Sequence, residues 1–136
     1  MDRDQGLVDA AVGQLDARWP GGPGVAAAVR LDGGDVLTSV ALDSLNSAAT
    51  LCAETGALCQ AYTLGRRVTA SACVSREDGT DAIDVLAPCG ICQERLALWG
   101  PGVRVAVADD TTAAGWTMRT LHEVNPYYWG ARFTRN

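Results

Sequence analysis

Two short stretches constrain this chain more than any other feature: Cys52-Ala53-Glu54 and Pro88-Cys89-Gly90-Ile91-Cys92. Together they supply three thiols and one carboxylate. Three thiolates can hold a zinc ion tetrahedrally and leave the fourth position open for water. A carboxylate that follows so soon after the first thiol would lie beside that water rather than on the metal. The pattern therefore predicts that the fold brings both stretches to one ion.

In this order, the two stretches resemble those of the small zinc-dependent cytidine deaminase family, which includes the blasticidin S deaminases. Each stretch follows a predicted strand and opens a predicted helix, and the resemblance is strongest over residues 25–107. It implies an α/β protein with a three-layer α/β/α cytidine-deaminase-like fold and a mixed, roughly five-stranded sheet. The length suits one zinc deaminase domain over residues 1–136.

The resemblance also implies roles for the motif residues. Cys52, Cys89 and Cys92 are the expected Zn²⁺ ligands, and Glu54 is the expected catalytic residue. Glu54 would take a proton from the zinc-bound water, pass it to a ring nitrogen and then protonate the departing ammonia. The implied reaction is hydrolytic deamination of a cytosine-type ring, in cytidine, deoxycytidine or a modified nucleoside such as blasticidin S. Another amino-substituted heterocycle is the alternative substrate.

Substrate contacts are implied at four residues. The backbone N–H of Ala53 would help to bind the pyrimidine carbonyl. Family members hold the ribose with an Asn-x-Glu pair, and the corresponding places here hold Ala41 and Asp43. Asn46, in the same loop, is a candidate substitute for the missing amide, and the tail residue Trp129 is a candidate contact to the site of its own or a neighbouring subunit. Because these sugar-binding residues are altered, the sequence does not identify which nucleoside is the substrate.

The predicted site carries a negative charge that some other group must offset. Three thiolates around Zn²⁺ leave a net negative centre, which members of the family usually offset with an arginine next to the metal motifs. Here Thr55 follows Glu54, and Gln93 and Glu94 follow the last thiol. Arg95, the hydroxyl of Thr55 and the N-termini of the two predicted helices are the candidates for this task.

Two other classes of protein fit part of the pattern. A thiol–disulfide oxidoreductase would explain the Cys89–Cys92 pair at a helix start but would leave Glu54 without a role. A non-catalytic zinc-stabilised domain would need a fourth ligand, for which Cys59, Cys73 and His122 are candidates. We expect both cysteines to be small core residues and the lone histidine to be a surface or hydrogen-bonded residue.

Composition and charge indicate which classes of molecule this protein binds and in which compartment it works. A formal net charge of −5 argues against a nucleic-acid polymer as substrate and favours a small molecule. No apolar run is long enough to span a membrane, and the charged N-terminus lacks the form of a signal peptide. We therefore expect a cytoplasmic protein whose five cysteines are thiols or metal ligands rather than disulfides. A homotetramer is implied by the resemblance alone.

The hydrophobic pattern predicts an amphipathic helix, a hairpin, and then helices and strands in alternation. Pro and Gly residues 20–24 end the first helix, and a Gly-rich turn at residues 32–35 joins the hairpin strands. A final helical turn is expected before Pro126. The predicted helices cover residues 5–19, 52–64, 89–99 and 120–124, and the predicted strands cover residues 25–31, 36–40, 67–75 and 103–108.

Overall fold

The computed structural model describes residues 3–134, so residues 1, 2, 135 and 136 of the predicted domain lie outside the described part. The strands are β1 (Gly24–Leu31), β2 (Val36–Val40), β3 (Val68–Arg76), β4 (Ile83–Leu86), β5 (Arg104–Ala108) and β6 (Trp116–Thr120). The α-helices are α1 (Gln5–Arg18), α2 (Thr55–Thr63), α3 (Gly90–Leu96) and α4 (Leu121–Val124). The 3₁₀ helices are η1 (Ser47–Ala49), η2 (Ala97–Trp99) and η3 (Ala131–Phe133).

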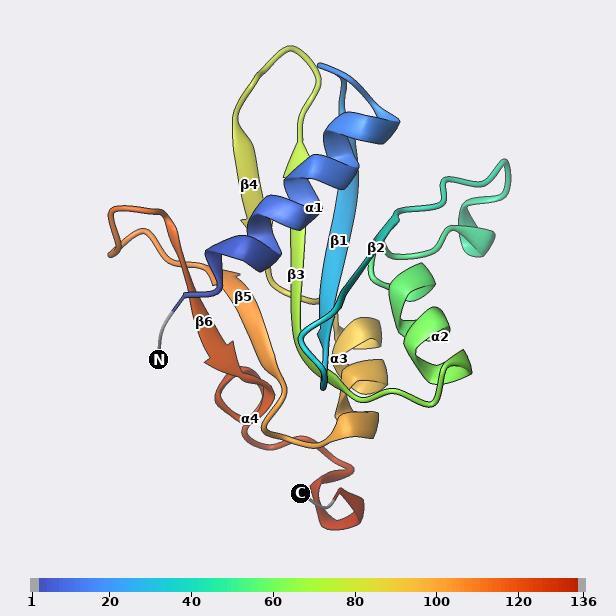
Figure 1. The fold of residues 1–136 in the computed structure, drawn as a ribbon, viewed down its shortest axis with the longest axis vertical. Coiled ribbons are helices and arrows are strands. Elements are labelled where there is room, and N and C mark those ends of the chain that lie inside the picture. Colours follow the sequence, from blue (N-terminus) through green and yellow to red (C-terminus); the bar gives the residue numbers. More distant parts are fainter. Residues whose placement is uncertain (1–2, 135–136) are drawn as a thin grey trace.

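The strands form one mixed sheet, as the sequence predicted (Figure 1). Its order is β2-β1-β3-β5-β6, and β4 pairs with β3 beside this path. The β3–β5 pair is parallel and the other pairs are antiparallel. The predicted hairpin is present, and Gly34 in its turn has φ +95°, a conformation that residues with a side chain rarely adopt.

Helices cover both faces of the sheet, which confirms the three-layer prediction. In Figure 1, α1 crosses one face while α2 and α3 lie together on the other. Strand β1 faces both layers because its side chains alternate: Ala26 and Ala28 pack with α1, whereas Val29 and Leu31 pack with α2 and α3. The alanines of β1 thus allow α1 to pack closely on one face, while larger side chains fill the space under α2 and α3 on the other.

Helix α1 is fixed to the sheet through its first turn. Asp4 is its N-cap and accepts a hydrogen bond from the backbone N–H of Leu7 at 3.1 Å. The same carboxylate accepts two hydrogen bonds from the guanidinium of Arg30 on β1, both at 2.7 Å. This fork-to-fork ion pair joins the helix to the neighbouring strand.

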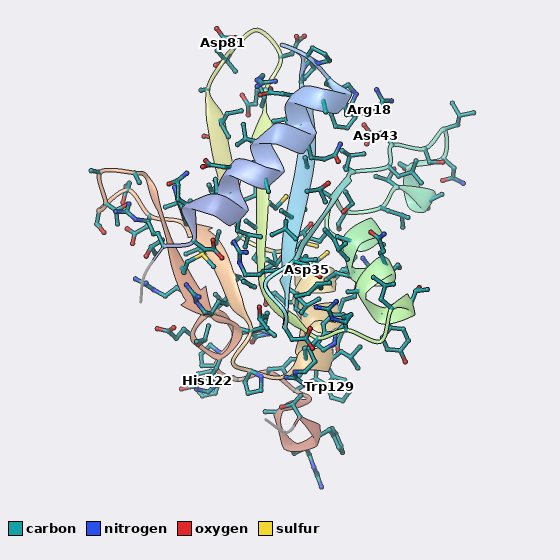
Figure 2. All side chains as sticks on the ribbon, in the orientation of Figure 1. Arg18, Asp35, Asp43, Asp81, His122 and Trp129 are labelled. Carbon is teal, nitrogen blue, oxygen red and sulfur yellow. The ribbon has the colours of Figure 1, made fainter. Side chains whose placement is uncertain are left out.

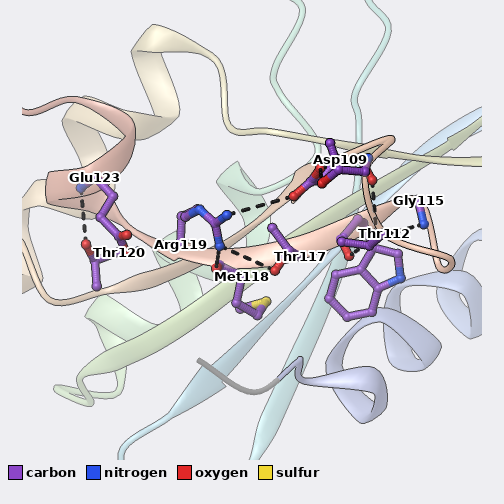
Figure 3. Close-up of polar contacts among 10 residues, drawn as sticks. Asp109, Thr112, Gly115, Thr117, Met118, Arg119, Thr120 and Glu123 are labelled. Carbon is purple, nitrogen blue, oxygen red and sulfur yellow. Dashed lines mark hydrogen bonds and ion pairs between the residues drawn. The ribbon is translucent and has the colours of Figure 1, made fainter.

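The C-terminal third contains the strand β6, which the sequence pattern did not single out. It pairs antiparallel with β5, and Figure 3 shows the contacts that close this hairpin. Arg119 lies 3.8 Å from Asp109 across the hairpin, and Thr120 caps α4 through a reciprocal pair of contacts with Glu123. The helical turn before Pro126 is therefore confirmed. Strand β4 lies just before the second metal motif, which confirms that this motif follows a strand.

Two details of the first metal-motif helix differ from the prediction. Helix α2 begins at Thr55 rather than at Cys52, because Ala53 and Glu54 form a turn that leads into it. Cys59 was predicted to be a core residue, but it lies on the exposed side of α2. Within residues 3–134, no helix is both long and apolar enough to cross a membrane.

Candidate active site and metal centre

Three cysteines from two separate parts of the chain meet at one point. The Sγ atoms of Cys52, Cys89 and Cys92 all lie within 4.8 Å of one another. Cys52 lies in the turn before α2, Cys89 is the N-cap of α3, and Cys92 is fully buried in the first turn of α3. The structure thus brings together the three residues that the sequence predicted as metal ligands.

This donor set fits zinc. Three sulfur ligands at a Zn–S distance of about 2.3 Å would lie roughly 3.8 Å from one another in a tetrahedral site, close to the observed spacing. Within the described residues, no fourth His, Cys, Asp or Glu joins the cluster. The arrangement therefore matches an open three-ligand site and gives no support to a closed four-ligand one. Cys59, Cys73 and His122 all lie outside it.

The three thiols differ in how readily they ionise. Burial raises the pKa of Cys92, and the hydrogen bond with Cys89 raises the pKa of Cys52. Burial also acts to raise the pKa of Cys89, but hydrogen bonds from the backbone N–H of Cys92, the Cys52 thiol and the N–H of Ile91 lower it overall. These N–H groups belong to the start of α3, where a helix favours an anion.

Glu54 lies beside the cluster and is almost completely buried, with 4% of its surface exposed. Burial raises the pKa of its carboxyl group. Hydrogen bonding and the positive charge of Arg95 act in the opposite direction but do not cancel it. A carboxylate with a raised pKa is suited to both accepting and donating a proton near neutral pH.

A pocket of about 280 Å³ opens onto Glu54 and the thiols. Its walls are mostly apolar, and strands β1, β3 and β4 supply part of them. Cys73 on β3 stands opposite Leu86 on β4 in the sheet register, and both line the pocket. The lining residues are Val25, Ala41, Thr50, Leu51, Cys52, Ala53, Glu54, Cys73, Leu86, Ala87 and Cys89. Cys73 is thus buried, as predicted, but it also forms part of the site.

Of the four predicted substrate contacts, one lines the pocket and three lie outside it. Ala53 lines the pocket, whereas Asp43 and Asn46 are exposed and are not among its lining residues. The side chain of Asn46 instead caps η1, accepting a hydrogen bond from Ala48 N at 3.0 Å. Trp129 is 71% exposed and donates to Glu94 on α3 at 2.6 Å. Figure 2 shows Asp43 and Trp129 at well-separated places on the molecule.

Sequence reasoning missed one residue that holds the site in shape. Ser39 on β2 donates a hydrogen bond from Oγ to the carbonyl oxygen of Ala53 at 2.5 Å and accepts one from Ala57 N at 3.0 Å. A Cβ on Gly56 would lie only 2.9 Å from the Cβ of Ser39, so the close approach needs glycine there. A lone serine in a predicted strand carries no signal of this role.

Known proteins share this architecture. The crystal structure of the cytidine deaminase from Bacillus anthracis matches with a TM-score of 0.85 and 37% identity, over 95% of this chain and 91% of that one. The chain belongs to the cytidine deaminase family, a family of aminohydrolases. Another family member, the cytidine deaminase from Mycobacterium tuberculosis, matches with a TM-score of 0.69 and 27% identity, over 95% of this chain and 99% of that one.

Sequence comparison points in the same direction. Blasticidin-S deaminase from Bacillus cereus is 28% identical over 87 residues. The matched stretch covers 61% of this chain and 62% of that relative. No family model matches the chain. Membership of the cytidine deaminase family therefore rests on the solved structures and on the arrangement of the site.

Proposed function

We propose that this chain is a zinc-dependent deaminase that hydrolyses the amino group of a cytosine-type ring in a nucleoside or nucleoside analogue and releases ammonia. The observation that carries the proposal is the meeting of three thiols with the buried carboxylate of Glu54 at the end of one pocket. Cys52, Cys89 and Cys92 would hold the zinc ion. The proposal treats residues 1–136 as one deaminase domain.

A zinc ion in this site would polarise a water molecule and make it a nucleophile at neutral pH. The protein's own residues would do the rest. A carboxylate oxygen of Glu54 would take one proton from the water and deliver it to the ring nitrogen beside the reacting carbon. Once the water oxygen has bonded to that carbon, Glu54 would take the second proton from this oxygen and deliver it to the amino group, which leaves as ammonia while the carbonyl forms. Its burial favours this role because the protonated and ionised forms become closer in free energy.

The pocket walls would hold the ring. Val25, Leu51 and Leu86 offer apolar surface for a planar heterocycle, and the backbone of Ala53 lies beside Glu54 to contact a ring carbonyl. Apolar walls also exclude bulk water, which strengthens the electrostatic interactions of Glu54. Asp43 and Asn46 stay in the proposal as contacts for a sugar or other substituent outside the pocket. Trp129 stays in it as a contact to the site of a neighbouring subunit.

One observation favours a second candidate substrate. Glu54 carries the only carboxylate or amide side chain among the described residues that line the pocket. A sugar diol is usually recognised by such groups, since buried hydroxyls need hydrogen-bond partners. An amino-substituted heterocycle without ribose therefore fits the same walls and the same chemistry.

Ammonia release by the purified zinc-loaded protein separates these candidates. The panel contains cytidine, deoxycytidine, free cytosine, blasticidin S, and several aminated purines and pterins. Turnover of cytidine or another cytosine nucleoside supports the first proposal. Turnover confined to a sugar-free heterocycle supports the second. A zinc-loaded protein that turns over no member of the panel contradicts both.

The proposal includes a homotetramer. Several large apolar side chains on α2, α3 and η2 are exposed, and a groove of about 430 Å³ runs between these helices. A set of this kind favours association with another protein surface, and self-association is the commonest case. The exposed residues of this set, called the helix patch below, are Tyr62, Leu64, Ile91 and Leu98.

A cytoplasmic location is also part of the proposal. All five cysteines are free in the structure, and a site made of three thiolates needs reduced sulfur. Reducing compartments keep thiols in that state.

A further inference from the structure

The proposed metal centre carries an excess of negative charge. Three thiolates and one divalent zinc ion sum to one negative charge, and the carboxyl group of Glu54 lies beside them in a buried position. Cys92 is itself fully buried. A charge in such surroundings is costly unless an opposite charge lies close by. A positive group within a few ångströms would therefore stabilise the centre.

The side chain of Arg95 reaches this position. Its Nη1 atom lies 3.9 Å from Cys92 Sγ and donates a hydrogen bond to Thr55 Oγ1 at 2.7 Å. Thr55 is the first residue of α2 and Arg95 is in the last turn of α3, so the contact spans the two helices that follow the metal motifs. Thr55 is 8% exposed, which fixes the hydroxyl that orients the guanidinium.

Other cations are committed elsewhere in the fold. The sequence contains no lysine, so its positive side chains are arginines together with His122, which is exposed. In the described residues, ion pairs join several arginines to carboxylates away from the thiols: Arg30 to Asp4, Arg66 to Asp32 and Asp35, Arg76 to Asp16, and Arg119 to Asp109. Arg95 is the arginine whose described contacts include a metal-motif thiol.

We propose that Arg95, oriented by Thr55, offsets the charge of the three-thiolate centre and so sets how tightly the chain holds zinc. The inference rests on the zinc site proposed above. Arg95 is a positioning residue rather than a catalytic one, because it acts on a ligand and does not touch the reacting atoms.

A purely mechanical role is the competing explanation. The Arg95–Thr55 hydrogen bond also ties α2 to α3, and its loss would lower stability whether or not zinc is present. Zinc affinity separates the two roles. A tie between helices predicts equal stability losses with and without metal, whereas charge compensation predicts a specific loss of zinc binding.

The test is a zinc titration in competition with a chromophoric chelator, on wild type, Arg95→Gln, Arg95→Lys and Thr55→Val. Loss of a partner behind the metal ligands typically weakens metal binding by about 10- to 100-fold, so we expect roughly tenfold for Arg95→Gln. Arg95→Lys should recover most of the affinity because it restores the charge. Thr55→Val should fall between wild type and Arg95→Gln.

Arg132→Gln is the matched control. It removes the same charge from η3, where Arg132 stacks on Phe133, and should leave zinc affinity unchanged. Equal affinity in wild type and folded Arg95→Gln would overturn the inference, and so would equal weakening in Arg95→Gln and Arg132→Gln. If Arg95→Gln does not fold, unchanged affinity in Thr55→Val overturns it. A wild-type chain that binds no zinc overturns the proposed site as well.

Discussion

The sulfur atoms of Cys52 and Cys89 lie 3.3 Å apart, although 37 positions separate these residues in the sequence. Their contact links the two metal motifs directly. It places a thiol from the turn before α2 against the N-cap of α3. A shared proton or a shared metal ion makes such a contact favourable, because two thiolates this close would repel each other.

Chelation should therefore change which thiols react. In the zinc-loaded protein, any thiol that reacts at once with a chromogenic disulfide reagent should be Cys59, which is exposed in the single chain. Cys52, Cys89 and Cys92 should react only after a chelator removes the metal, because coordinated thiolates are poor nucleophiles. Cys59→Ser is the control, and it should show no fast reaction. Immediate reaction of Cys89 and Cys92 in that variant, before chelation, would favour a thiol–disulfide oxidoreductase.

Ser39→Ala should loosen the turn that contains Glu54. The substitution leaves the carbonyl of Ala53 and the N–H of Ala57 without their partner, at a cost of about 1–3 kcal/mol in unfolding free energy. The turnover rate should fall as well, because the turn also positions the carboxylate of Glu54, to which we assign the proton transfers. Urea unfolding and steady-state kinetics measure the two effects.

Thr38→Val is the neighbouring control for Ser39. Thr38 donates to Gln14 on α1 at 2.7 Å, and no described contact joins it to the active site. It should lower stability without lowering turnover. If Ser39→Ala behaves in the same way as Thr38→Val, Ser39 supports the fold but does not position the site.

The Asp4–Arg30 ion pair should make stability depend on pH in acid. The hydrogen bond from Arg30 lowers the pKa of Asp4 in the folded protein. The carboxylate therefore stabilises the fold fully above its unfolded pKa of about 3.9, and this contribution is lost as the pH falls through the lower folded value. Asp4→Asn should cost about 1–2 kcal/mol near neutral pH and should converge with wild type in acid.

Chemical unfolding at a series of pH values tests this dependence. Asp9→Asn is the control, because Asp9 is exposed on α1 and accepts a hydrogen bond only from Gln5 in the described contacts. It should change stability by less than about 0.5 kcal/mol at every pH. A constant difference between Asp4→Asn and wild type down to pH 2 would contradict the assignment.

The helix patch should hold the proposed tetramer together. Light scattering should give four times the 14.2 kDa chain mass for wild type. Leu98→Glu adds a charge to an apolar side chain that is 62% exposed, and it should shift the mass to smaller species. Ala17→Glu adds the same charge to the exposed side of α1 and should leave the mass unchanged. A wild-type mass at the monomer value would refute this part of the proposal.

The metal motifs could be predicted from the sequence because their chemistry lies in residue type and short spacing. Cys89 and Cys92 share one helical turn, so their meeting is local. The three-layer fold was also predictable, because the motifs resemble those of a known family and the alternation of helices and strands favours a mixed sheet with helices on its faces.

Other features depend on tertiary contacts that no local pattern carries. Strand β6 is short and becomes a strand by pairing with β5. Cys59 was wrongly predicted to be buried, because the outer side of α2 has no covering element within the described chain. The Arg95–Thr55 contact joins residues 40 positions apart and depends on how α2 packs against α3.

The most direct measurement is ammonia release by zinc-loaded wild type and Glu54→Gln on the best substrate of the panel. Loss of the proton-moving carboxylate should lower kcat by at least about 100-fold, while metal analysis still finds one zinc per chain. Glu77→Gln, at an exposed turn, should retain wild-type activity. If Glu54→Gln keeps its zinc and releases ammonia at the wild-type rate, the proposed role of the buried carboxylate is wrong.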